Sequence, residues 1–136
     1  MKACSIIDAP SELGLRRTGG DGFPDALRTS GLLEGLPDVR YASCLPAPPY
    51  VPRRDTSTAV LNPDGIRAFG LRLAERVAFT LDLGWFPLSL GGDCSILLKT
   101  ALALRRRGRW RGQSRLHAPL PPSPCIQLTR HRAPRG

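Results

Sequence analysis

Residues 89–100 read SLGGDCSILLKT, a turn of two glycines, an aspartate and a cysteine between two apolar runs. The run before the turn, FPLSL at 86–90, has the length and composition of a short strand. The run after the turn continues to about Arg107 and predicts a helix that begins near Ser95. The turn therefore places Cys94 at the carboxyl end of a predicted strand.

Strands and helices alternate along the chain. The predicted strands are 3–8, 38–43 and 86–90, and the predicted helices are 24–36, 63–83 and 95–107. Alternation of this kind favours an α/β fold with a parallel sheet that helices cover on both faces. Ligands bind at the carboxyl ends of such strands, and the Gly-Gly-Asp-Cys turn lies at one of those ends.

The clearest helix signal lies at 63–83. Asn62 is predicted to cap this helix, and Pro63 suits its first turn. Apolar residues recur at three- and four-residue spacing and predict a buried face, while most charged residues are expected on the other sides. The apolar set is Ile66, Phe69, Leu73, Val77 and Leu81, and the charged set is Arg67, Arg72, Glu75, Arg76 and Asp82. Four prolines make 45–58 irregular, and the glycine-rich stretch 13–22 predicts a long loop.

Charge divides the chain unevenly. Residues 1–93 hold all eleven acidic residues against ten basic ones, whereas residues 94–136 hold ten basic residues and no acidic one. Beyond Gly108 the sequence is rich in Arg and Pro without apolar periodicity, a composition that predicts disorder. The expected organisation is a folded α/β portion at 1–108 and a disordered tail at 109–136.

The basic end supports a second class of function, a small nucleic-acid-binding protein that acts through residues 105–136. Its arginines would neutralise phosphates, and Trp110 would stack on a base. No recognised nucleic-acid-binding motif precedes this segment, so nucleic acid is the less favoured partner.

The cysteines form no metal-binding or redox motif. Cys4, Cys44, Cys94 and Cys125 lie 40, 50 and 31 residues apart, without a CxxC pair. The first apolar run is too short for a signal peptide, and no segment has the length that spans a bilayer. We therefore expect a cytoplasmic protein with reduced thiols and no membrane partner.

The turn at Gly91–Cys94 admits a structural and a functional interpretation. Without further context it is a tight turn that buries a small thiol. Asp93 either caps the following helix or orients a ligand from behind, and capping is the preferred interpretation. A nucleophilic role for Cys94 lacks a base, because His117 and His131 both lie in the basic tail.

Three stretches, in this order, resemble the ureohydrolases, the arginase and agmatinase family. They are residues 6–36, the helix at 61–84, and FPLSLGGDCSILLKT at 86–100, which is similar to the P-x-x-LGGDHS element of the family. The resemblance covers roughly residues 3–108. It implies the N-terminal portion of a truncated three-layer α/β/α fold, with the first strand between the second and the third.

The resemblance also implies a chemistry, in which hydroxide bridging two manganese ions attacks a guanidinium carbon. Cys94 stands at the position of a histidine ligand, and Lys99 stands where glycine is common. The other five ligands belong to D-x-H-x-D and D-x-D segments, which this sequence lacks because no aspartate follows Asp93. We therefore expect an inactive form without manganese. In the intact family the substrate is a small guanidino compound, for which arginine, agmatine, guanidinobutyrate and formimidoylglutamate stay open, as does an oligomeric state.

The loss of acidic residues suggests a cause for these departures. Composition rich in Arg, Pro, Ala and Gly without Asp or Glu is typical of a GC-rich gene read out of frame, and the resemblance ends near Trp110. We hypothesise that a shift of reading frame, or an error in the gene model, replaced the genuine continuation. A D-x-H-x-D segment is then expected in another frame of the downstream DNA, and its absence from both other frames would sink the hypothesis.

Overall fold

The computed structural model describes residues 3–109 of the chain. The order of its elements matches the predicted alternation of strands and helices. They are β1 (Cys4–Ala9), the 3-10 turn η1 (Gly20–Gly22), α1 (Phe23–Thr29), β2 (Val39–Cys44), α2 (Pro63–Asp82), β3 (Phe86–Gly91) and α3 (Ser95–Arg109). The predicted tail at 109–136 lies, apart from Arg109, outside the described residues.

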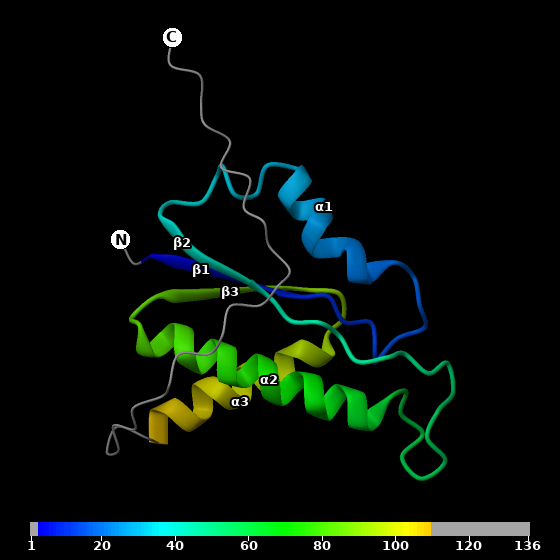
Figure 1. Cartoon of the computed structure of the whole chain (residues 1–136). Helices are drawn as coiled ribbons and strands as arrows, with labels where there is room; N and C mark the ends of the chain where they lie inside the picture. Colours follow the sequence, from blue (N-terminus) through cyan, green and yellow to red (C-terminus); the bar gives the residue numbers. More distant parts are fainter. Residues whose placement is uncertain (1–2, 110–136) are drawn as a thin grey trace.

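The three strands form one parallel sheet in the order β2-β1-β3 (Figure 1). At the centre of the sheet Ile6 is in register with Ala42 on one side and with Leu88 on the other. Right-handed crossovers produce this order when the second connection passes back over the first strand. The prediction that the first strand lies in the middle is confirmed.

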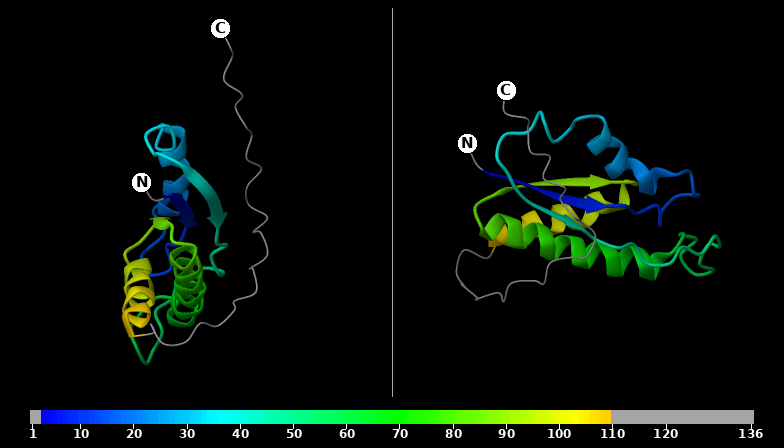
Figure 2. Two further views of the ribbon diagram at one scale, coloured as in Figure 1. Left: turned by 90° about the vertical axis from the view of Figure 1, so that its left-hand side faces the viewer. Right: turned by 45° about the horizontal axis from the view of Figure 1, so that its top comes forward.

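Helices cover both faces of the sheet. α1 lies on one face, whereas α2 and α3 lie side by side on the other, as the views in Figures 1 and 2 agree. The predicted three-layer α/β/α arrangement is therefore confirmed. In the described part of the chain, no helix has the combination of length and apolar composition that a membrane crossing requires.

The main core lies between the central strand and α2. All of β1 is buried, and its residues Ile7 and Ala9 pack with the apolar stripe of α2 at Phe69, Leu73 and Val77. Packing against the sheet explains why this stripe, predicted from its helical spacing, is the most buried part of α2. Arg76 is an exception to the predicted pattern, because it is 5% exposed although it was assigned to the polar sides.

The predicted end of α1 and the predicted side-chain cap of α2 are wrong. α1 ends at Thr29 rather than continuing to 36, because the hydroxyls of Thr29 and Ser30 bond back to backbone carbonyls and Gly31 turns the chain with a φ of 88°. Asn62 precedes α2 but does not cap it, since its backbone is left-handed and its side chain binds two other segments. Pro63 does occupy the first turn, as predicted.

α2 and α3 approach closely where a lysine crosses a glycine. A Cβ atom added at Gly70 would lie 2.2 Å from Cγ of Lys99 and 3.2 Å from its Cβ. The absent side chain of Gly70 thus provides the space for the stem of Lys99. Lys99 is therefore accommodated by a glycine on the neighbouring helix.

This contact predicts a coupled pair of substitutions. Gly70→Ala alone should lower the free energy of unfolding by about 1–3 kcal/mol, because the new methyl group overlaps the lysine stem. In a Lys99→Ala background the same change should cost little, since the overlap is gone and alanine favours the helix. Urea unfolding of the four variants measures both effects. Equal costs of Gly70→Ala in the two backgrounds would contradict this account of the packing.

Candidate functional site at the carboxyl edge of the sheet

The loops that follow β1 and β3 meet at the carboxyl edge of the sheet, and a glycine makes their contact close. A Cβ atom added at Gly92 would lie 2.5 Å from the carbonyl oxygen of Ser11 and 2.7 Å from that of Gly20. No side chain fits at these distances, so glycine is required at this point of the turn. The second glycine of the Gly-Gly-Asp-Cys turn therefore positions the loop after β1.

Asp93 fixes the same two loops to each other. Its side chain is buried, its Oδ1 accepts the N–H of Ser95 at 2.8 Å, and its Oδ2 accepts the N–H of Gly14 at 3.0 Å. The first bond satisfies an N–H group at the start of α3. The second bond joins the turn to a loop that precedes it by 79 residues.

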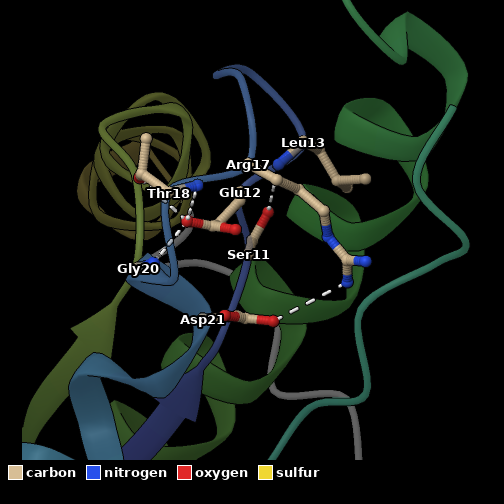
Figure 3. Close-up of polar contacts among 7 residues, drawn as sticks. All are labelled: Ser11, Glu12, Leu13, Arg17, Thr18, Gly20 and Asp21. Atoms are coloured by element: carbon tan, nitrogen blue, oxygen red, sulfur yellow. Dashed lines mark hydrogen bonds and ion pairs between the residues drawn. The ribbon is translucent and has the colours of Figure 1, made fainter. Parts of the chain in front are cut away.

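Glu12 organises the remainder of the loop after β1 (Figure 3). Its Oε1 accepts hydrogen bonds from the backbone N–H of Thr18 at 3.1 Å, from the Thr18 hydroxyl at 3.1 Å, and from the N–H of Gly20. Burial alone would raise the pKa of Glu12, but the hydrogen bonds from Gly20 and Thr18 outweigh it and hold the pKa below its ordinary value. The glycine-rich stretch is thus a loop folded around an ionised carboxylate.

A cavity of about 240 Å³ opens between this loop and the proline-rich loop after β2. Its lining includes Glu12, Arg17, Asp21 and Tyr50. The guanidinium of Arg17 lies 5.6 Å from the centre of the Tyr50 ring, and its Nη2 lies 3.8 Å from Oδ2 of Asp21. The Tyr50 hydroxyl donates to the carbonyl of Leu15 at 3.0 Å, which holds the two walls together.

Asn62 connects the loops after β1 and β2 to α2. Its Nδ2 donates to the carbonyl of Leu13 at 3.0 Å, and its Oδ1 accepts the N–H of Val51 at 2.7 Å. The Asn62 side chain, which was predicted to cap a helix, therefore joins two loops through hydrogen bonds. This contact explains how a proline-rich segment without helix or strand is held beside the site.

Asp8 is a second buried acid near the end of β1. Its Oδ2 pairs with the guanidinium of Arg28 on α1, and only 6% of the residue is exposed. Burial raises the pKa of Asp8, and the charge and hydrogen bond of Arg28 offset only part of that rise. The pair attaches α1 to the sheet.

The residues around Cys94 do not fit a manganese centre. Cys94 is exposed, and its thiol is a soft ligand. Both oxygens of the neighbouring Asp93 already accept backbone N–H groups. Among residues 3–109, no group of three or more His, Cys, Asp or Glu side chains lies close enough to hold a metal ion.

The sequence did not indicate the polar residues that build this edge. Glu12 and Arg17 lie inside the stretch 6–36 that carries the resemblance, but no role was predicted for them or for Tyr50. One signal was available, because Glu12 is an acid that lies four residues after a predicted strand and directly precedes a glycine-rich loop. Such a carboxylate can accept the N–H groups that the loop exposes.

The chain is similar to arginases in both sequence and structure, although no family model matches it. It is 34% identical to the arginase of Bacillus subtilis (strain 168) over 103 residues, which are 73% of the chain and 34% of that protein. It is 33% identical to the arginase of Bacillus caldovelox over 105 residues, 74% of the chain and 35% of that protein. The chain thus spans about a third of the length of these relatives.

Solved structures give the same result. The native arginase of Bacillus caldovelox superposes with a TM-score of 0.70 at 30% identity, over 79% of this chain and 38% of that one. A crystal structure of arginase from Bacillus subtilis superposes with a TM-score of 0.64 at 29% identity, over 78% of this chain and 34% of that one. Both likenesses cover most of the described residues.

The role of Glu12 generates a pH-dependent prediction. Its pKa in the folded chain lies below the ordinary value of 4.5, so ionised Glu12 stabilises the fold above that pH. This contribution is lost as the pH falls through the lowered pKa. Glu12→Gln should therefore melt a few degrees below the parent at pH 7, and the difference should shrink on acidification.

Thermal melts from pH 7 down to pH 3 measure this difference. Glu75→Gln, an exposed position on α2, is the matched control and should change the melting temperature little at any pH. A Glu12→Gln deficit that stays constant over the whole range would contradict the assigned role of the carboxylate.

Proposed function

Because residues 3–109 have the N-terminal portion of the arginase fold, we propose that this chain is the N-terminal portion of an arginase-family hydrolase of linear amidines. We also propose that the 136-residue chain is inactive, which means that it does not hydrolyse a guanidino compound by itself. The intact activity would act on the C–N bond of a guanidino substrate with manganese as cofactor.

The likeness to arginases supports the family part of the proposal. It combines about a third of identical residues with a shared fold over most of the described chain. The parallel sheet with the order β2-β1-β3 agrees with the strand order that the family resemblance implies. The sequence and the fold therefore both support this family.

The small number of side chains that could bind metal supports the proposed inactivity. Two divalent ions close together need several carboxylates to offset their mutual repulsion. In the described residues no cluster of three donors exists, and the printed sequence has no acidic residue after Asp93. Manganese would supply an activated hydroxide in the family reaction, but the residues of this chain do not fit it, and no hydrolytic step follows from them.

The residues do supply a fixed edge of the sheet. Glu12 and Asp93 hold the loops after β1 and β3, and Asn62 adds the loop after β2. In this proposal the portion shapes the rim of the site, and Cys94 occupies the position of a histidine ligand without binding manganese. The folded portion at 1–108 is the part of the chain that carries this role.

The nucleic-acid alternative gains no support. In the described part of its segment, Arg105 and Arg106 are exposed, whereas Arg107 pairs with Asp82 at 2.9 Å. Residues 110–136, to which this alternative assigns most of the binding, lie outside the described residues. The relatives and solved structures described above are arginases.

The proposal predicts the outcome of an activity assay. The purified chain with added manganese should release no urea from arginine or agmatine, because the ligands for a binuclear centre are missing. Cys94→His should restore nothing, since one imidazole does not replace the absent carboxylates. Urea release and bound manganese are measured on the same samples.

The arginase of Bacillus caldovelox, assayed in parallel, shows that the conditions support turnover. Turnover by the chain that rises with its bound manganese would contradict the proposed inactivity. It would mean that residues outside the family motifs form a working metal centre.

A further inference from the structure

Asp8 faces α1, the helix that lies alone on its side of the sheet (Figure 1). Its neighbours in register are Cys44 of β2 and Leu90 of β3, and its Oδ2 accepts a hydrogen bond from the guanidinium of Arg28 on α1. The other oxygen, Oδ1, is buried and has no hydrogen-bond partner among the described residues. Burying an ionised carboxylate with one unbonded oxygen costs free energy, because the water that would bind this oxygen is lost.

Little else attaches α1 to the fold. Pro24 is the only buried residue of this seven-residue helix, and Phe23 is 49% exposed. The main hydrophobic core contains residues of β1, α2 and α3 but, within residues 3–109, none of α1. A helix this short is not stable alone in water, so α1 forms only while it is packed against the sheet. Its attachment can therefore open while the main core stays packed.

Few charged or titratable groups surround Asp8. α1 contributes Arg28 and Asp25, β2 contributes the Cys44 thiol and the exposed Arg40, and β3 has no charged residue. Burial raises the pKa of Asp8, the charge and hydrogen bond of Arg28 lower it by less, and the charge of Asp25 raises it further. A carboxyl with a raised pKa in the attached state binds a proton more readily there than in an open state, where it meets water. Falling pH therefore favours attachment as it passes through the raised pKa.

We propose that Asp8 makes the attachment of α1 pH-dependent, so that protonation of Asp8 tightens the contact with the sheet and ionisation loosens it. The neutral carboxyl still accepts the Arg28 N–H group and costs less to bury. The ionised form favours opening, which uncovers the apolar face of the sheet at Ile6 and Leu90, both buried while α1 is attached. This device requires no metal and no hydrolysis, so it is independent of the proposed function.

Hydrogen exchange of the full chain, followed by NMR, tests the proposal. The protection factor is the factor by which an amide exchanges more slowly than in an unstructured peptide at the same pH. For the amides of residues 27–30 it should be about threefold higher at pH 4 than at pH 7. These amides should exchange faster than those of β1 at both pH values, because they open locally. The ¹³C shift of the Asp8 carboxyl should titrate with the same midpoint as the protection of α1.

Two substitutions separate the charge of Asp8 from its contact. Asp8→Asn is neutral at every pH and keeps an oxygen that accepts from Arg28, so the protection of α1 should lose its pH dependence. Arg28→Met leaves the carboxylate without its partner, so protection at pH 7 should fall and the gain at pH 4 should exceed that of the parent. Asp64→Asn removes an exposed acid from the first turn of α2 and should keep the pH dependence of the parent.

The pH dependence of the α1 amides decides the outcome. A protection factor in the parent that is equal at pH 4 and pH 7, or lower at pH 4, would overturn the proposal. A pH dependence that persists in Asp8→Asn would do the same, because another group would then be responsible. If Arg28→Met opens α1 fully at pH 7, recovery of its protection at pH 4 supports the proposal, and no recovery contradicts it.

Discussion

The carboxylate of Asp93 joins the two loops that follow β1 and β3, and the carboxyl edge of the sheet depends on this joint. One oxygen satisfies the start of α3, and the other accepts the N–H of Gly14. The contact is possible because Gly92 lets the backbone of Ser11 and Gly20 approach within 3.0 Å of the place where a Cβ would lie. Glu12 acts in the same way, since its buried carboxylate accepts the backbone N–H groups of Thr18 and Gly20 in the loop after β1. The edge is thus built by acids that accept backbone hydrogen bonds.

The sheet presents this edge through its central strand. β1 is buried along its length between β2 and β3, so the loop that leaves it has a fixed origin. β3 pairs with β1 and with no other strand in the described residues, and large apolar side chains at Phe86, Leu97 and Leu98 are more than half exposed.

Local signals in the sequence were sufficient for the strands and for helices on both faces of a parallel sheet, whereas the order of the strands was predicted from the family resemblance. The spacing of Phe69, Leu73 and Val77 and the alternation of strand and helix depend on neighbours within one or two turns, so they are readable in one dimension. The roles of Asn62 and Glu12 were not readable, because Asn62 contacts Leu13 across 49 positions and the folded loop decides what each carboxylate accepts. Arg76 and the early end of α1 were missed for the same reason, since tertiary packing and a single glycine turn override the local helix pattern.

The exchange rate of the Gly14 amide proton reports on the joint between the two loops. Hydrogen exchange of the full chain, followed by NMR, should show a protected Gly14 N–H in the parent and much faster exchange at Gly14 in Asp93→Ala. The amides of β1 should stay protected in both proteins, which shows that the sheet is intact. Asp64→Ala, in the first turn of α2, should leave Gly14 unchanged. If Gly14 exchanges at the same rate with and without the Asp93 carboxylate, that side chain does not hold the two loops together and the account is wrong.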